Sequence, residues 1–371
     1  MASKKPVTEG DLLTFLEEGQ LQFPPLEFVA AQTQATSAAW DRQTRLDALL
    51  TLRWRDRSYR FGVETRRLWT PKAVSEAVDA VRRNVGRAEL YPLILVPYLA
   101  DERLLLLEAQ GVSGIDLCGN GVVVVPGELL VLRTGFPNRF RWEGTIKNVY
   151  RKNSSVVARA FLLVPEFGSV KEALEEIRTR GGEVTLATVS KVCTSLEAGL
   201  VIERGRGEPP AARRLRLLQP EKLLDLLAEN YSSPNVSRTL LGKSGLQPEQ
   251  LRNRLAGWEK ETGEKVVLTG ASSVEAYAVM AREPVQSLYC TDIDGAVRSL
   301  GGDLRETDRF ANLALLETRD DFVYFDRRPG LVASPIQTYL ELAAGEKRER
   351  ETAEQVRGLI LRPLAQAARM E

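Results

Sequence analysis

One stretch of this chain restricts its fold more than any other: a helical segment that runs directly into two short apolar runs. Residues 185–200 read TLATVSKVCTSLEAGL, in which Val189, Val192 and Leu196 recur at the spacing of a helix with one buried face. Thr185 is a suitable N-cap for this helix. The residues that follow, LVIERGRGEPPAARRLRLL, read as two strands joined by a Gly/Pro turn. The sequence therefore predicts a helix followed by a hairpin.

The predicted outer face of this helix is small, polar and cationic, because Thr188, Lys191 and Ser195 lie opposite the apolar face. A helix that enters a DNA groove requires such a face, and arginines in the hairpin after it can contact phosphate groups. The predicted DNA-contacting residues are Thr185, Thr188, Lys191, Ser195, Arg204, Arg206, Arg213 and Arg214. The alternative is an ordinary amphipathic helix in a module that binds a protein partner.

The composition excludes several kinds of catalytic and metal site. The chain has 371 residues and no histidine, which removes Ser-His-Asp triads, Cys-His dyads, His-ligated metals and His acid–base catalysis. Cys118, Cys193 and Cys290 are far apart and form no CxxC pair, so neither a structural zinc nor a disulfide framework is expected. The formal net charge is only +1, so a surface that binds nucleic acid must be local.

Nothing in the sequence predicts a membrane protein. The first residues, MASKKPVTEGDLLTF, are partly basic but lack the apolar region of a signal peptide. No apolar run approaches the about 20 residues that span a bilayer. Because the unpaired cysteines also fit a reducing compartment, we expect a cytoplasmic protein without a membrane partner.

The order of predicted elements divides the chain into four segments. Residues 1–34 contain an acidic amphipathic helix and a linker-like stretch, PPLEFVAAQ. Residues 35–150 alternate strands with helices, which is typical of an α/β domain. Residues 151–231 have the order of a winged helix-turn-helix, and three helices with a hairpin can bury a core of their own. Residues 232–371 mix helices with short strands and predict a C-terminal α/β domain.

The second segment carries two carboxylates on neighbouring predicted strands, Asp47 on one and Glu64 on the next. Glu64-Thr65-Arg66 resembles the core of PD-(D/E)XK nucleases, in which an Asp and a Glu hold Mg²⁺ and a Lys orients the attacking water. Arg66 stands at the lysine position, and a permanently charged guanidinium fits that role poorly. The resemblance predicts a degenerate, catalytically silent nuclease-like domain. The alternative is an active Mg²⁺-dependent nuclease that uses Asp47, Glu64 and Arg66.

Asp116 and Asn120, in the sequence GIDLCGN, are a second polar pair in this segment. They could line the same cleft as the two carboxylates. Asp and Asn next to glycine more often form an Asx turn that connects two strands tightly, and we expect this structural role.

The fourth segment has a superficial likeness to nucleotidyltransferases, which place a Gly-Ser turn ahead of a strand that bears an Asp-x-Asp metal pair. The sequences LTGASS and TDID supply these residue types at Gly270, Ser272, Asp292 and Asp294. The gap between them is longer than that fold uses, and Asp294-Gly295 fits a turn after a strand. We therefore expect a nucleotidyltransferase-like domain without transfer activity.

Several motifs in the same order resemble a known family. The helix and hairpin are followed by VVLTGASSVEAYA, then SLYC, then SPIQTYLELAAGEKRERETAEQVRG, and are preceded by LILVPYLADERLLLLEAQGVSGIDLCGN. Over residues 41–367 this order is similar to the AbiEi-type antitoxins of type IV toxin–antitoxin systems. The resemblance implies a bacterial transcriptional regulator that represses its own operon, and a cognate toxin as a protein partner.

The sequence thus predicts an α/β multidomain protein that is not an enzyme and has no cofactor or metal. Its expected domains are a nuclease-like α/β domain, a central winged helix-turn-helix and a C-terminal, nucleotidyltransferase-like α/β domain. Its expected function is sequence-specific binding of double-stranded DNA, and a homodimer would bind a palindromic or repeated site. Two other functions stay open: the Mg²⁺-dependent nuclease, and a protein-interaction module that neutralises a toxin.

Overall fold

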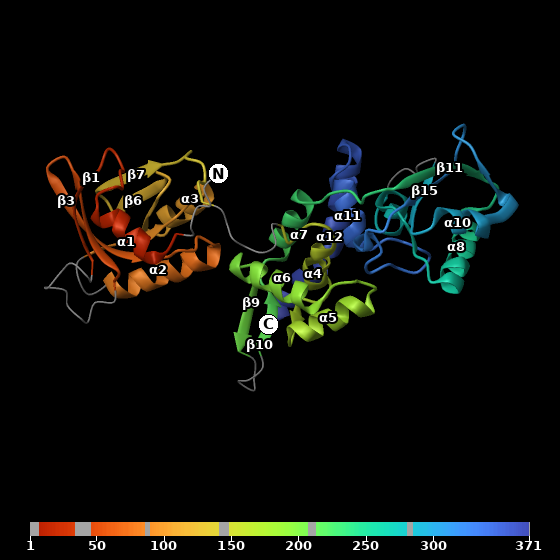
Figure 1. Cartoon of the computed structure of the whole chain (residues 1–371), viewed down its shortest axis with the longest axis horizontal. Coiled ribbons are helices and arrows are strands. Elements are labelled where there is room, and N and C mark those ends of the chain that lie inside the picture. Colours follow the sequence, from red (N-terminus) through yellow and green to blue (C-terminus); the bar gives the residue numbers. More distant parts are fainter. Residues whose placement is uncertain are drawn as a thin grey trace. The chain divides into compact units, whose positions relative to one another are not determined.

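The computed structural model describes residues 7–33, 46–85, 90–140, 148–206, 213–279 and 285–370. Contacts divide the chain into two compact units, Met1–Gly144 and Thr145–Glu371 (Figure 1). Helices and three β-sheets occur in the described residues, so the expected α/β multidomain class is confirmed. None of the helices in these ranges combines the length and the apolar character needed to cross a lipid bilayer.

The first unit is built on a seven-stranded sheet whose strands follow the order of the sequence. These are β1 (Glu27–Thr33), β2 (Ala48–Trp54), β3 (Arg57–Thr65), β4 (Tyr91–Val96), β5 (Ser113–Asp116), β6 (Gly121–Val125) and β7 (Leu129–Arg133). The β3–β4 and β4–β5 pairs are parallel, whereas the other neighbours are antiparallel. Parallel neighbours need a crossover, which α2 (Pro71–Val85) and α3 (Asp101–Ala109) supply.

Both faces of this sheet are buried, which explains the uninterrupted apolar run of β4. Leu93 and Leu95 join the core that includes residues of α1 (Glu9–Glu17), while Ile94 and Val96 join the core that includes α2 and α3. Side chains alternate between the faces of a strand, so a strand covered on both sides must be apolar at every position. At the start of α2 the Ala73 N–H donates to the Thr70 hydroxyl at 3.2 Å.

The interpretation of PPLEFVAAQ as linker-like is wrong, because most of it forms β1. This strand pairs antiparallel with β2 from Glu27↔Arg53 to Thr33↔Ala48, with an irregularity between Phe28 and Ala30. Only one of its seven residues, Thr33, is buried, and an edge strand with so little buried surface has no clear apolar alternation. The boundary expected at residue 34 therefore falls within one compact unit.

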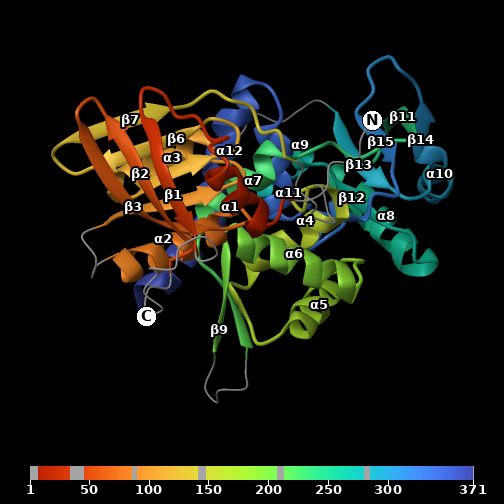
Figure 2. The ribbon, with the colours of Figure 1, turned by 60° about the vertical axis from the view of Figure 1, so that its left-hand side comes forward.

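The second unit begins with the elements that the sequence predicted around the hairpin. These are α4 (Lys152–Leu163), β8 (Glu166–Phe167), α5 (Val170–Thr179), α6 (Leu186–Ala198), β9 (Ile202–Arg206), β10 (Arg213–Leu217) and α7 (Pro220–Glu229). β10 is the middle strand of a three-stranded antiparallel sheet in the order β8-β10-β9. Helix α6 leads into the β9–β10 hairpin, as Figure 2 shows.

The rest of this unit surrounds a five-stranded sheet in the order β12-β13-β15-β11-β14. Its strands are β11 (Arg238–Ser244), β12 (Val266–Leu268), β13 (Gln286–Cys290), β14 (Leu304–Glu306) and β15 (Leu313–Glu317). Its helices are α8 (Pro248–Thr262), α9 (Gly270–Ser273), α10 (Ile293–Leu300), α11 (Pro335–Ala343) and α12 (Lys347–Met370). Leu255 of α8 and Ile293 of α10 belong to the core of this sheet.

Residues 151–231 share their core with the C-terminal part of the unit. Apolar residues of α4 and α6 lie in one cluster with Val267, Phe322 and Val356. Arg159 of α4 is only 1% exposed and donates to the Phe322 carbonyl (3.1 Å) and to Gln337 Oε1 (2.8 Å). A fragment that ended near residue 231 would expose this core and leave Arg159 without these acceptors, so the expectation that the segment can bury a core by itself is not supported.

Candidate nucleic-acid interface

Helix α6 has one apolar face and one polar face, as predicted. Val189, Val192, Cys193 and Leu196 are its buried residues. Thr185 is its N-cap, and the Thr185 hydroxyl accepts a hydrogen bond from the Thr188 N–H at 3.2 Å. The helix therefore begins where the sequence placed it, with its polar face turned away from the core.

The four residues of α6 and its cap that were predicted to contact DNA differ in their exposure to solvent. Lys191 and Ser195 are exposed, and Lys191 has no ion pair within the described part of the chain. Thr188 is half-buried, and its hydroxyl lies 3.0 Å from the hydroxyl of the capping Thr185. These two threonines therefore have a local structural role, and Lys191 and Ser195 are the better candidates for contact with a ligand.

Two exposed hydroxyl residues on α6, Ser190 and Thr194, were not predicted as contacts. Ser190 immediately precedes Lys191, and Thr194 lies about one turn after it, so both flank the lysine on the outer face. The sequence contains the signal that identifies them. The contact residues were predicted as those opposite the apolar face, whereas a stripe centred on Lys191 at helical spacing also includes Ser190 and Thr194.

The hairpin arginines are largely paired with carboxylates. Arg204 Nε lies 3.0 Å from Glu197 Oε2 of α6, and the Arg204 side chain is only 26% exposed. Arg214 Nη1 lies 2.8 Å from Glu166 Oε1 of β8, and Arg216 Nε lies 2.9 Å from Glu203 Oε1 of β9. The number of arginines alone suggested a surface of free cations. Because these three are paired, this part of the hairpin is not such a surface.

Arg206 and Arg213, the other two predicted hairpin contacts, are Cα partners at the end of the β9–β10 ladder. Their side chains, and residues 207–212 between the strands, lie outside the described part of the structure. The backbone pairing brings two arginine positions together at this end of the hairpin.

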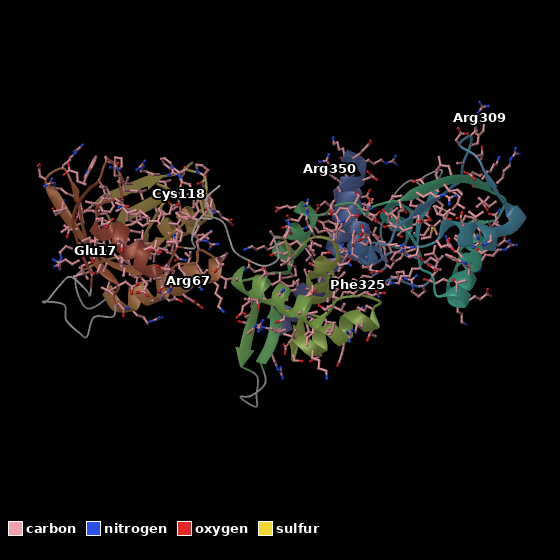
Figure 3. The ribbon with its side chains drawn as sticks, in the orientation of Figure 1. Glu17, Arg67, Cys118, Arg309, Phe325 and Arg350 are labelled. Atoms are coloured by element: carbon pink, nitrogen blue, oxygen red, sulfur yellow. The ribbon has the colours of Figure 1, made fainter. Side chains whose placement is uncertain are left out.

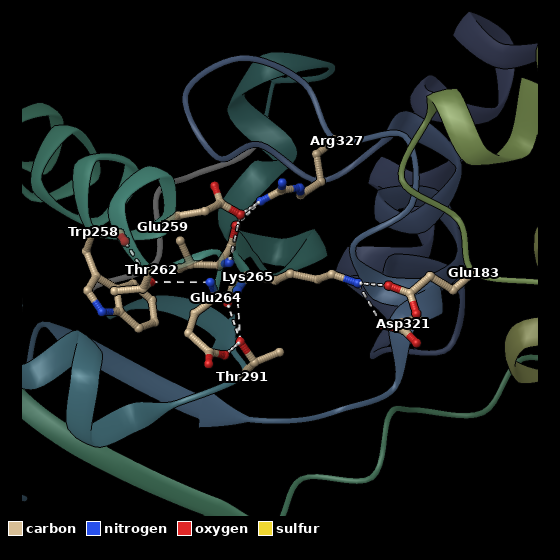
Figure 4. Close-up of polar contacts among 10 residues, drawn as sticks. Glu183, Trp258, Glu259, Thr262, Glu264, Lys265, Thr291, Asp321 and Arg327 are labelled. Atoms are coloured by element: carbon tan, nitrogen blue, oxygen red, sulfur yellow. Dashed lines mark hydrogen bonds and ion pairs between the residues drawn. The ribbon is translucent and has the colours of Figure 1, made fainter.

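The turn between α5 and α6 is held by residues from the C-terminal half of the unit. Lys265 Nζ lies 2.7 Å from Glu183 Oε1 in this turn and 2.9 Å from Asp321 Oδ1 (Figure 4). Arg180, at the start of the turn, places Nη1 2.7 Å from Asp326 Oδ1, and its carbonyl accepts the Asp326 N–H at 2.9 Å. Burial lowers the pKa of Lys265, but the two carboxylates outweigh this effect and raise it above its usual value.

This arrangement predicts an energetic coupling between Lys265 and the turn. We expect Lys265→Met and Glu183→Gln each to lower the free energy of unfolding. Because both changes remove the same ion pair, the double variant should lose less than the sum of the two single losses. The difference, which is the coupling energy, should be about 0.5–1 kcal/mol. Urea denaturation of the wild type, both single variants and the double variant measures it. Lys171→Met, which alters a 79%-exposed lysine on α5, is the matched control. Strict additivity would show that the ion pair does not fix the turn.

In the first unit, the three residues of the nuclease-like motif lie together as predicted. Ala48 pairs with Val63, and the Asp47 N–H donates to the Val63 carbonyl at 3.0 Å, so Asp47 and Glu64 are cross-strand neighbours. Glu64 is 6% exposed, and burial, followed by the nearby Asp47 carboxylate, raises its pKa.

Donors from the chain itself already engage these two carboxylates. Arg66 Nη1 lies 2.6 Å from Glu64 Oε1 and also donates to the Thr65 carbonyl at 2.7 Å. Asp47 Oδ2 accepts the Thr65 N–H at 2.7 Å and its hydroxyl at 2.9 Å. Within the described ranges, no group of three or more His, Cys, Asp or Glu residues could hold a metal ion. The guanidinium therefore lies where a cation would otherwise neutralise Glu64.

Asp116 and Asn120 form a turn, as expected, and not the wall of a cleft. Asp116 is 1% exposed, and its Oδ1 accepts the N–H groups of Cys118, Gly119 and Asn120 at 2.8, 2.7 and 2.8 Å. Its Oδ2 accepts the Leu99 N–H at 2.9 Å and the Asn120 side-chain amide at 2.8 Å. The carboxylate thus ties β5 and β6 to the segment before α3.

The residues compared with nucleotidyltransferases have local structural roles. Asp292 caps α10 by accepting the Gly295 N–H at 3.0 Å, and Asp294 Oδ1 lies 2.8 Å from Arg238 Nη1. The Gly270 N–H donates to Glu341 Oε2 at 2.6 Å, and the Ser272 hydroxyl accepts the Ser287 N–H at 2.8 Å. Each of the four residues thus has a partner that accounts for it without a bound metal.

Comparison of the chain with models of known protein families, with curated proteins and with solved structures finds no match. The geometry of α6 and the hairpin is therefore the ground for a functional proposal.

Proposed function

We propose that this chain is a sequence-specific DNA-binding protein in which residues 151–231 act as a winged helix-turn-helix. In this proposal α6 is the recognition helix, and β9 and β10 are the wing. The element order α4-β8-α5-α6-β9-β10, with β10 between β8 and β9, matches the arrangement that winged helices use. The observation that carries the proposal is the outward polar face of α6 around the exposed Lys191.

The paired arginines change the kind of binding that we expect. Non-specific affinity for DNA grows with the number of phosphate charges that free cations neutralise. Since Arg204, Arg214 and Arg216 are paired within the protein, few cations on the described hairpin are free for this purpose. Discrimination would then depend on Lys191 and the hydroxyl side chains of α6, which can contact base edges. The proposal thus predicts modest non-specific binding and a shallow salt dependence.

The resemblance to AbiEi-type antitoxins extends the proposal to a biological role. In this role the protein represses transcription of its own operon, and a toxin is its protein partner. Lys265 and Asp326 hold the α5–α6 turn through Glu183 and Arg180, and this supports such a role because it links the proposed DNA reader to the C-terminal half of the unit.

The experiment that tests DNA binding is selection of duplexes by the full chain. Randomised double-stranded fragments are incubated with the protein, and the bound fraction is sequenced over successive rounds. We expect one motif to become enriched, and we expect Lys191→Ala to lose this enrichment while its circular dichroism spectrum stays unchanged. If the folded wild type enriches no motif, the protein-interaction module becomes the preferred function.

The alternative nuclease function is disfavoured by the Arg66–Glu64 ion pair. We expect supercoiled plasmid to remain intact after incubation with the protein and Mg²⁺ or Mn²⁺, because the guanidinium cannot act as the lysine does. Gel electrophoresis over time measures cleavage, and Asp47→Ala and Glu64→Ala are run beside the wild type. Cleavage that both variants abolish would establish the nuclease and overturn this prediction.

A further inference from the structure

An open cavity of about 510 Å³ lies in the second unit, beside the place where β11 ends and the antiparallel β14 begins. It is lined by Lys243, Ser244, Gly245, Gly302, Asp303, Arg305, Thr307 and Arg309. None of these residues belongs to α6 or to the hairpin, so the proposed DNA-binding function does not account for the cavity. Its volume lies within the range that small-molecule sites occupy, about 300–1,000 Å³.

Three side chains of the lining are cationic, Lys243, Arg305 and Arg309, and one is acidic, Asp303. Lys243 and Arg305 are Cα partners in the β11–β14 ladder, and like charges directly opposite each other destabilise a sheet. Arg309 lies at the outer end of the β14–β15 loop (Figure 3). All three are exposed, and none has an ion pair in the ranges that the structure describes. Asp303, the carboxylate in the lining, lies 2.7 Å from Arg254 Nη1 outside the cavity.

Uncharged groups around these cations are held in place before any ligand arrives. Asn312 accepts the Ser244 N–H at 2.8 Å and donates to the Ser244 carbonyl at 2.9 Å. The Ser244 hydroxyl oxygen accepts the Leu246 N–H at 3.2 Å, which leaves its hydrogen to donate. A Cβ at Gly245 or Gly302 would meet nothing within 4 Å, so the backbone at both positions is open. The lining therefore combines one positioned serine hydroxyl with three exposed cations.

We propose that this cavity binds a small ligand with two or more linked phosphate groups. Arginine matches phosphate with two parallel N–H donors, and lysine adds a point charge, so the three cations suit several phosphate oxygens at once. The bound phosphates would also relieve the repulsion between Lys243 and Arg305. This inference does not depend on the proposed DNA-binding function.

The residue that follows Arg309 in the sequence is aromatic and offers a way to distinguish two sources of these phosphates. Phe310 follows Arg309, is 88% exposed and has a φ of 54°, in the left-handed region that favours glycine. An exposed phenyl ring beside a phosphate site can stack on a nucleobase. A nucleoside triphosphate would use this ring, whereas an inorganic polyphosphate would not.

The test is titration calorimetry and thermal denaturation of the full chain with sodium tripolyphosphate, compared with sodium sulfate at the same ionic strength. We expect Lys243→Met and Arg305→Met each to weaken tripolyphosphate binding about tenfold. Without ligand, both variants should melt at or above the wild-type temperature, because each removes a like-charge repulsion. Arg319→Met is the matched control. Arg319 is exposed and follows β15, at the end of this strand that is away from the cavity. It should bind as the wild type does.

A nucleoside triphosphate, tested on the wild type and on Phe310→Ala, identifies the source. Tighter binding that the variant loses would indicate a nucleotide, and equal binding of both ligands would indicate the phosphate chain alone; either result supports the site. Four results would overturn it: no binding, equal stabilisation by sulfate, equal loss in Arg319→Met, or binding of a short single-stranded oligonucleotide without binding of either small ligand. Lower ligand-free melting temperatures in Lys243→Met and Arg305→Met would assign these cations a structural role instead.

Discussion

Lys191→Glu is expected to weaken binding of the full chain to its selected duplex by about 100-fold. A good side-chain contact with a base contributes about 1–3 kcal/mol, and a carboxylate at the same place adds repulsion from the phosphates. About 3 kcal/mol corresponds to a factor of about 100 in Kd. Lys191 is exposed and has no carboxylate partner within the described residues, so removing it releases no buried acid. Fluorescence anisotropy with a labelled duplex measures the change.

The control for this variant makes the same charge change elsewhere in the proposed winged helix. Lys171→Glu alters a 79%-exposed lysine on α5, where we expect less than about a twofold effect. Arg214→Ala offers a second comparison: because Arg214 is paired with Glu166, we expect its loss to weaken binding little and to leave the salt dependence almost unchanged. A Lys191→Glu protein that binds its duplex as tightly as the wild type would remove α6 as the recognition helix.

Asp116→Ala is expected to lower the free energy of unfolding of the first unit by about 4 kcal/mol or more. The buried carboxylate accepts five hydrogen bonds, from the N–H groups of Leu99, Cys118, Gly119 and Asn120 and from the Asn120 side chain. Alanine would leave these donors without their acceptor in a site that is 1% exposed. Each unsatisfied buried donor costs about 1–3 kcal/mol. Urea denaturation with a probe of the first unit measures the loss.

Asp116→Asn separates the hydrogen bonds from the packing of the side chain. Its amide has nearly the same shape, but one oxygen becomes an NH₂ group that cannot accept a hydrogen bond. If the remaining oxygen faces the turn, it still accepts the N–H groups of Cys118, Gly119 and Asn120, while the NH₂ group meets the Leu99 N–H. We expect a loss of about half that of the alanine variant. Equal stability of all three proteins would show that the hydrogen bonds of this turn do not hold the unit together.

Some features of this protein followed from the sequence because their causes are local. The α6 helix begins at its predicted cap because Thr185, Thr188 and the apolar spacing lie within about three consecutive turns. The Asx turn at Asp116 depends on residues at most four positions away, apart from Leu99. The alternation of strands and helices in the first unit was predicted in the same way, from periodicity and turn residues.

Other features were decided by the tertiary structure, because they join residues that are distant in the sequence. The edge strand β1 exists through its pairing with β2 and has almost no buried pattern of its own. The acids that pair with Arg204 and Arg214 come from α6 and β8, so the arginine count overstated the free charge of the hairpin. Lys243 and Arg305 become neighbours only through the register of β11 and β14. Helix caps and turns depend on a few consecutive dihedral angles, whereas the position of a charge on a surface depends on strand register and helix docking, which the whole core fixes.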